Sequence, residues 1–204
     1  YANKRVMVQM DRLLNRLLEW VRSSLPDTYL ACICLFNLSF LEDSHPKLLY
    51  YCPSPPNLVL ENPLSLLRTL ERMMQLYVPL IYPKQQTKFV HSVEGEAVRW
   101  STGIIKNLVS EQDSHVAATL VAKTKLAYWM LQCLSRSQRP LYEWKLDSLE
   151  DLALHVILHL AKWPESSRQL QKWNAADALA HLEGKGGIHD MRASWIRCSL
   201  ERVV

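Results

Sequence analysis

Apolar residues recur every three or four positions along most of this chain, and no segment alternates apolar and polar residues convincingly enough to predict a β-strand. Near the start of the chain, the recurring apolar residues are Val6, Met10, Leu13, Leu14, Leu17, Leu18 and Val21. This spacing places them on one face of a helix. We therefore predict a single first helix over this segment and an all-α fold.

Capping residues and prolines predict where the next helices begin and end. The segment SLPD is a helix-start pattern, so a second helix is expected from about 26 to 40. A third helix is expected over 64–82, with Pro79 kinking or ending it. A loop over 84–95 then leads into a helix over 96–109.

The second half of the chain continues in the same way. The segment SEQDSHVAATLVAKTKLAYWMLQCL predicts one long helix that begins near Ser110. The segment SLED begins the next helix, which Pro164 ends. One or two short helices follow, split near Asn174, and a last helix covers 188–203. The pattern predicts seven to nine helices.

Prolines concentrate between the second and third expected helices, at Pro46, Pro53, Pro55, Pro56 and Pro63. Proline lacks a backbone N–H and disfavours regular helix. We expect residues 43–63 to form a proline-rich irregular insertion within a single domain over 1–204.

One eight-residue outline recurs in ACICLFNL, STGIIKNL, ALHVILHL and ASWIRCSL. Each copy begins with a small residue, which is Ala31, Ser101, Ala153 or Ala193. Six positions later comes a polar residue, which is Asn37, Asn107, His159 or Ser199, followed at once by leucine. The last two copies are 40 residues apart, which is inside the range of about 40–47 for helical repeats of the armadillo and HEAT type. Small residues allow helices to approach closely, and the polar column is expected to face a shared exposed surface.

These residues resemble the armadillo family, most closely in ACICLFNLSF, VRWSTGIIKNLVSEQ and ALHVILHLAKWPESSRQLQKWNAADALAHL. The resemblance implies a right-handed α-solenoid of stacked armadillo-like helical repeats. It also implies that Asn37, Asn107 and His159 line a groove that holds another protein's segment. The sequence departs from the family at Ile33, Gly103 and His155, where peptide-binding repeats place a tryptophan.

Tryptophans beside basic residues add candidate contacts. Trp100 follows Arg99, and Trp163 follows Lys162, a mixture of aromatic and cationic groups that protein interfaces favour. We expect Arg99, Trp100 and Trp163 to contact the partner. The apolar patterns instead predict Trp20, Trp129 and Trp195 to be core residues.

The sequence predicts a non-catalytic protein-binding scaffold that holds a helix or an extended segment on its concave surface or a terminal helix. The net charge of +4 leaves a nucleic-acid-associated domain as an alternative, with the basic first and last helices making the contacts. Nucleic-acid binding would weaken steeply as salt rises, whereas binding in an apolar protein groove would be less sensitive.

No motif in the sequence indicates catalysis or cofactor binding. His155 and His159 stand one helical turn apart, but zinc needs more ligands, and no HExxH or CxxC motif accompanies them. The sequence GKGG lacks the spacing of a phosphate-binding loop. We therefore expect no metal, no cofactor and no small-molecule substrate.

The remaining composition bears on where the protein acts. Five cysteines in mostly apolar patterns favour a reducing compartment, either cytoplasm or nucleus. No apolar run approaches the roughly 18 residues of a membrane span, so we expect a soluble domain that does not enter membranes. Because the chain begins at Tyr1, we expect it to be a piece of a longer protein.

Overall fold

The computed structural model describes residues 2–23, 27–50, 65–82, 92–110, 115–137, 145–184 and 186–202. These residues form α-helices and one short 3-10 helix, η1 (Glu42–Ser44), and none of them lies in a strand. The helices are α1 (Ala2–Gln9), α2 (Asp11–Arg22), α3 (Asp27–Leu38), α4 (His45–Tyr50), α5 (Ser65–Ile81), α6 (Val93–Val109), α7 (His115–Ala122), α8 (Leu126–Arg136), α9 (Leu149–Leu160), α10 (Pro164–Lys172), α11 (Ala175–Ala180) and α12 (Ile188–Glu201). The all-α class is confirmed. The predicted number of helices was too low, because the described residues alone contain twelve α-helices.

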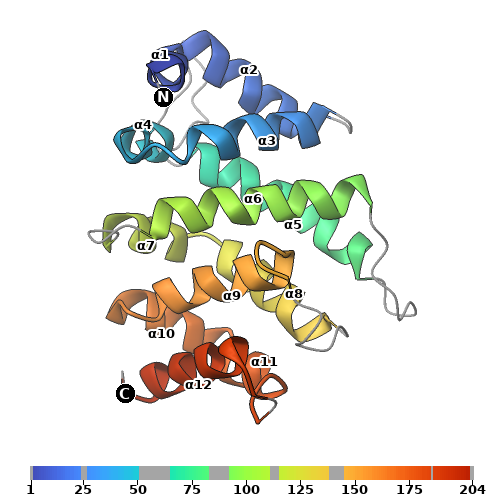
Figure 1. The fold of residues 1–204 in the computed structure, drawn as a ribbon, viewed down its shortest axis with the longest axis vertical. Helices are drawn as coiled ribbons and strands as arrows, with labels where there is room; N and C mark the ends of the chain where they lie inside the picture. The colour runs from blue at the N-terminus through green and yellow to red at the C-terminus, as the bar shows by residue number, and fades with distance from the viewer. Residues whose placement is uncertain are drawn as a thin grey trace.

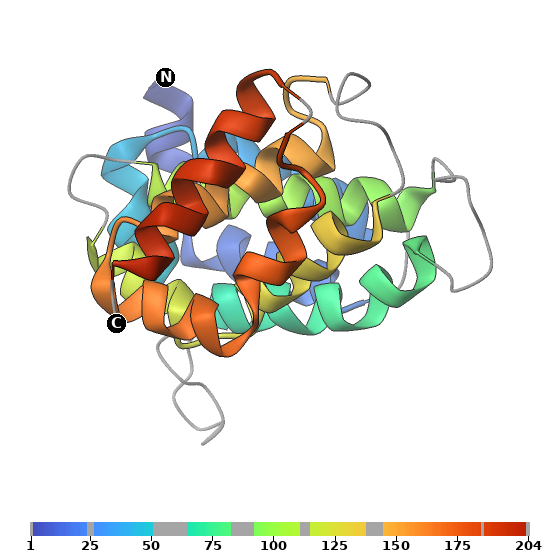
Figure 2. The same cartoon turned by 90° about the horizontal axis from the view of Figure 1, so that it is seen from below.

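The helices are stacked along the long axis of the molecule, with the two chain ends at opposite ends of the stack (Figure 1). One row consists of α3, α6, α9 and α12, each in contact with the next, and we call it the α3 row. A second row, the α2 row, consists of α2, α5, α8 and α11, again each in contact with the next. Figure 2 shows that α5 and α6 lie in separate layers and that α12 crosses the stack diagonally.

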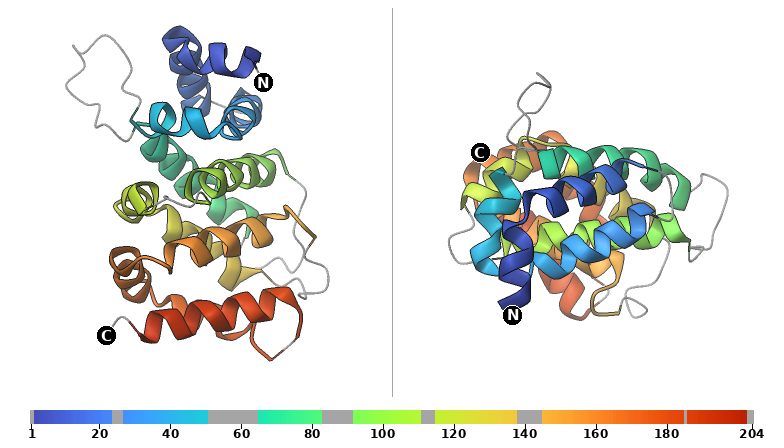
Figure 3. Two further views of the ribbon diagram at one scale, coloured as in Figure 1. Left: turned by 60° about the vertical axis from the view of Figure 1, so that its left-hand side comes forward. Right: turned by 90° about the horizontal axis from the view of Figure 1, so that it is seen from above.

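Each helix of the α3 row packs against the α2-row helix that precedes it in the chain, so that α2 pairs with α3, α5 with α6, α8 with α9 and α11 with α12. The shorter helices contact one another beside the rows, α1 with α4 and α7 with α10 (Figure 3). In Figure 1 all four helices of the α3 row begin at the right and end at the left. The four helices of this row therefore run in the same direction.

The repeated register falls on equivalent positions of the α3 row. Its small residues, Ala31, Ser101, Ala153 and Ala193, are all fully buried. Its leucines, Leu38, Leu108, Leu160 and Leu200, are buried as well. The Sγ atom of Cys32 lies 3.3 Å from the Oγ atom of Ser101, so α3 and α6 approach closely at this column.

Gly103 permits another close approach between the same two helices. A Cβ atom at this position would lie 2.7 Å from Cε2 of Phe36 on α3. The Phe36 ring also packs against Trp100, with 4.8 Å between ring centroids. A tryptophan at position 103 would therefore collide with Phe36, which gives a packing reason for the glycine.

The single first helix predicted from the apolar spacing was wrong. The structure ends α1 at Gln9 and begins α2 at Asp11, with Met10 between them in an extended conformation. The spacing misled because Val6 and Met10 are exposed, whereas Val8 is the buried residue of α1. The break allows α1 to lie against α3 and α4 as well as α2.

The long helix predicted from Ser110 was also wrong, because α7 ends at Ala122 and α8 begins at Leu126. The intervening turn is held by side chains from α5. A carboxylate oxygen of Glu71 accepts a hydrogen bond from the backbone N–H of Lys125 at 2.9 Å. Within the turn, the hydroxyl of Thr124 donates to the Val121 carbonyl and accepts from the Leu126 N–H.

The irregular insertion predicted over 43–63 was wrong in its first part, because η1 and α4 cover 42–50. Pro46 is the second residue of α4, where no internal N–H bond is needed. The hydroxyl of Ser44 donates to the Leu38 carbonyl at 2.8 Å and fixes this segment against α3. The other prolines of the insertion and Cys52 lie outside the described residues.

Prolines limit the helices less than expected. α5 continues through Pro79 to Ile81. α9 ends at Leu160, before Pro164, which instead forms the first turn of α10. The predicted split near Asn174 is confirmed, with Asn174 in a left-handed conformation at φ 54° between α10 and α11. The Ser148 cap is confirmed too, since its Oγ accepts from the Asp151 N–H.

The buried and the exposed cysteines should differ in their reactivity toward thiol reagents. Burial raises the pKa of Cys32 to about 11 and also raises the pKa of Cys133, whereas Cys34 and Cys198 are exposed. Because the thiolate is the reactive form, a thiol reagent at about pH 8 should modify Cys34 and Cys198 rapidly in the folded protein and spare Cys32 and Cys133. Mass spectrometry of digested protein measures this. Rapid modification of Cys32 in the native protein would contradict the α3–α6 contact.

Candidate functional site

The outward face of the α3 row carries the residues of the candidate site. We define the exposed strip as Ile33 and Asn37 on α3, Lys106 on α6, His155, His159 and Lys162 on α9 and its C-terminal turn, and Met191, Trp195 and Ser199 on α12. All are at least partly exposed. Ile33, His155 and Trp195 share one register position, and Asn37, His159 and Ser199 share another one turn later. The remaining strip residues lie within one helical turn of these two positions, so the set follows one side of the row. A partner segment that crosses the helices would meet them in succession.

The two asparagines of the predicted site differ in accessibility. Asn37 is exposed, and its Nδ2 donates to the Ile33 carbonyl of its own helix at 3.0 Å. Asn107 is only 9% exposed, and its Nδ2 donates to the Ser39 hydroxyl at 2.9 Å. The amide of Asn107 therefore links α6 to the end of α3, whereas that of Asn37 faces solvent.

A cluster of basic and histidine side chains occupies the centre of the strip. We call Lys106, His155, His159, Lys162 and Arg192 the basic cluster. The rings of His155 and His159 are stacked, with 6.1 Å between centroids and 17° between planes. The Nζ of Lys162 lies 3.3 Å from Nδ1 of His159. The charge of Lys106 on α6 acts on both rings, and that of Arg192 on α12 acts on the His155 ring.

The cluster holds its histidines in the neutral form. Partial burial, followed by the charges of Lys162, His155 and Lys106, lowers the pKa of His159 to about 4. Partial burial also lowers the pKa of His155, and the Arg192 charge adds to this effect while Asp151 opposes it. Because both pKa values are lowered, protonation of these rings opposes folding. Their contribution to stability is present above the ordinary histidine pKa of about 6.5 and is lost as pH falls toward about 4.

The titration of His159 is a direct test of this environment. We expect its ring to remain neutral at about pH 5.5, where an ordinary histidine is mostly charged. Proton NMR of the ring as a function of pH should give a midpoint near 4 for His159. A His159 midpoint near 6.5 would show that neither partial burial nor the charges of the basic cluster lower its pKa.

Arg99 and Trp100 lie together near the start of α6. The guanidinium of Arg99 stacks on the Trp100 ring at 4.0 Å from its centroid, pairs with Glu96 at 2.8 Å and donates to the Asp147 carbonyl at 3.3 Å. Trp100 is partly buried and packs against the core. Both residues thus take part in contacts within the fold, and their contact with a partner stays a prediction.

Trp163 does not join the other candidates. It precedes α10, packs against the core, and its ring lies 5.0 Å from that of His115 on α7. The structure therefore brings Asn37, Asn107 and His159 to one register of the α3 row but places Trp163 at the α7–α10 contact.

The predicted core position of Trp195 was wrong, because this side chain is 45% exposed on α12. Trp20 and Trp129 are partly buried against the core as expected. The position of Trp195 in the fourth copy of the register could have indicated that its side chain is exposed. Its position matches Ile33, Gly103 and His155, so this helix alone carries the tryptophan that the other copies lack.

The basic first and last helices lie at opposite ends of the stack (Figure 1). Arg5 pairs with Asp43 at 2.8 Å and Arg16 with Glu19 at 3.0 Å, so acidic neighbours balance part of the charge of the first helices. A nucleic acid contacting α1 and α12 together would have to span the whole molecule.

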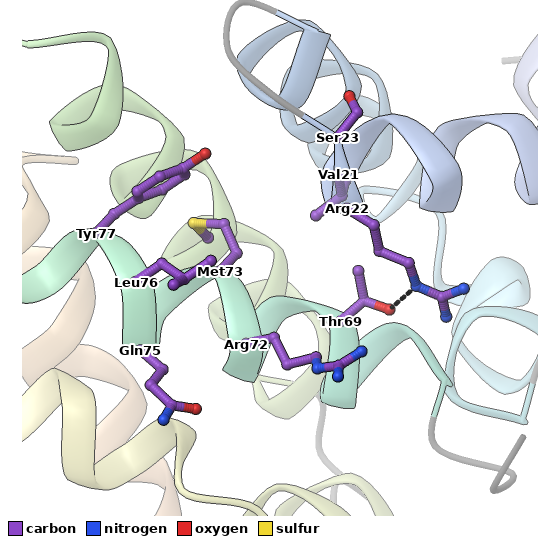
Figure 4. A pocket seen from close by; sticks show the side chains of 9 residues that line it. All are labelled: Val21, Arg22, Ser23, Thr69, Arg72, Met73, Gln75, Leu76 and Tyr77. Carbon is purple, nitrogen blue, oxygen red and sulfur yellow. Dashed lines mark hydrogen bonds between the residues drawn. The ribbon is translucent and has the colours of Figure 1, made fainter. Parts of the chain in front are cut away.

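A hollow of about 380 Å³ lies between α2 and α5, in the α2 row (Figure 4). Val21, Met73, Leu76 and Tyr77 supply apolar walls. In Figure 4, Arg22 donates to the Thr69 hydroxyl at 3.1 Å across the hollow. The hollow contains none of the predicted site residues.

The described residues contain neither a metal-binding cluster nor a membrane-spanning helix. Within them, no group of three or more histidine, cysteine, aspartate or glutamate side chains is arranged to hold a metal ion. No described helix is both long and apolar enough to cross a bilayer. No protein-family model matches the sequence, and no curated protein is significantly similar to it.

Proposed function

We propose that this protein is an armadillo-like α-solenoid that acts as a non-catalytic interaction scaffold and holds a helical or extended segment of another protein along the exposed strip. The observation that carries the proposal is the shared register of α3, α6, α9 and α12, whose small residues are buried, while its polar residues on three of these helices, Asn37, His159 and Ser199, are at least partly exposed. Stacked repeats need small residues where helices approach, and they leave one side of each repeat for binding.

The arrangement supports a unit of three helices. The sets α1–α3, α4–α6, α7–α9 and α10–α12 each contribute one helix to the α2 row and one to the α3 row. We infer that these sets are eroded armadillo-type repeats in a right-handed superhelix. The partner would contact Asn37, Lys106, His159 and Trp195, with Trp195 as the aromatic anchor of the surface.

Quantitative affinity capture with matched variants tests this function. Trp195→Ala and His159→Glu change the strip, whereas Leu76→Ala and Gln75→Glu make comparable changes at exposed positions of α5. We expect the strip variants to lose the same bound protein, and the α5 variants to retain it. Identical sets of bound proteins for all four variants would reject the proposed surface.

A further inference from the structure

Among the residues that the structure describes, the basic cluster has more positive charge than paired carboxylates. Arg192 pairs with Asp151 at 2.7 Å. Among the described residues, no carboxylate forms an ion pair with Lys106 or Lys162. Uncompensated positive charge on a surface attracts anionic partners.

We propose that the basic cluster binds the carboxylates of an acidic segment of the partner protein, and that His155 and His159 take up protons when it binds. The inference rests on the proposed function and specifies the chemistry of the partner. The lysines supply charge at neutral pH, and the neutral imidazoles supply further charge once carboxylates lie beside them.

The surroundings of the cluster favour a protein segment over a nucleic acid. Exposed apolar side chains continue the strip on α12, where Met191 and Trp195 are among the exposed large hydrophobic residues. A peptide can match such a surface by combining acidic with apolar side chains. Nucleic-acid binding favours a longer stripe of basic residues that can meet many phosphates.

The helix spacing sets the spacing of the acidic residues. Neighbouring packed helices lie about 8–10 Å apart, and a chain in the polyproline II conformation advances about 3.1 Å per residue and presents every third side chain to the same face. A segment that crosses α6, α9 and α12 would therefore offer an acidic residue about every third position. We therefore infer that the bound segment of the partner carries an acidic residue at about every third position.

The proton uptake follows from the charges around the two rings. Lys106 on α6, Arg192 on α12, and Lys162 after α9 disfavour protonation of one or both rings, and Asp151 and Asp147 favour that of His155. Incoming carboxylates would counter the positive charges and raise both pKa values. As the pH falls from about 7 to about 5.5, the two histidines of the complex take up protons, while the glutamates of the partner stay mostly ionised. Binding should therefore strengthen about 5- to 10-fold over this range.

The test uses a synthetic peptide of repeated Glu-Thr-Val triplets, with fluorescence anisotropy to measure its affinity. A peptide of the same composition with its glutamates together at one end is the control for spacing. We expect Lys162→Glu to weaken binding of the triplet peptide at least about 10-fold, and Lys123→Glu, at an exposed turn after α7, to leave it unchanged. His155→Gln combined with His159→Gln should remove the pH dependence.

Three results would overturn the inference: equal effects of Lys162→Glu and Lys123→Glu, an affinity independent of pH in the unsubstituted protein, or tighter binding of a single-stranded oligonucleotide than of the triplet peptide. Failure here is distinguishable from failure of the proposed function. A partner that depends on Trp195 but ignores the charge variants would leave the scaffold function intact and reject only its acidic chemistry.

Discussion

Replacing Asp151 with alanine is expected to lower the free energy of unfolding by about 3–5 kcal/mol, because it removes one partner of a buried ion pair. The Asp151 side chain is 3% exposed and that of Arg192 is 15% exposed. The other carboxylate oxygen of Asp151 accepts a hydrogen bond from the Asp147 N–H at 3.1 Å. One side chain thus joins α12 to α9 and shapes the turn before α9, and its loss leaves a guanidinium without its carboxylate.

Chemical denaturation of the two proteins measures this loss. Asp43→Ala is the matched control, because Asp43 also pairs with an arginine, at 2.8 Å, but both side chains are largely exposed. Exposed pairs of this kind contribute less than about 1 kcal/mol. If Asp151→Ala cost no more than Asp43→Ala, the Asp151–Arg192 contact would not hold α12 to α9.

The second large effect is expected at the small-residue column of the register. Ser101→Leu places a larger side chain at a fully buried position beside Cys32, where α3 and α6 approach closely. Overpacking a dense interior costs about 1–3 kcal/mol. We expect this loss in denaturation experiments, together with faster thiol labelling of Cys32 as the two helices separate.

Ala180→Leu is a control for the change in side-chain size, because Ala180 is exposed at the end of α11. It should leave stability within about 0.5 kcal/mol of the unsubstituted protein. A Ser101→Leu protein as stable as the Ala180→Leu protein would show that the column does not mark a close helix contact.

The stacked α3 row was largely predictable from sequence because its determinants are local. Ala31, Ser101, Ala153 and Ala193 sit at one helical position, and the leucine seven residues later falls on a buried face in every copy. Periodicity within a single helix reports such burial. It also predicted that Asn37 and His159 face the surface.

The features that the sequence did not predict depend on contacts between distant segments. The turn between α7 and α8 is stabilised by Glu71 on α5, which no local pattern reveals. Asn107 is buried and donates a hydrogen bond to Ser39, which is distant from it in the sequence. The basic cluster likewise forms only when α6, α9 and α12 lie side by side, although Lys106 adjoins the polar column in the sequence.

Site-specific photocrosslinking can show whether a partner protein lies along the exposed strip, since it reports which surface a bound protein touches. A photoreactive phenylalanine analogue at Asn37, at Lys106 or at Trp195 samples three helices of the α3 row, and the same analogue at Gln75 or Leu76 samples the α2 row. We expect the three strip positions to crosslink to one and the same protein and the two α5 positions not to crosslink to it. Crosslinks to that protein from Gln75 and Leu76, with none from the strip, would contradict this expectation.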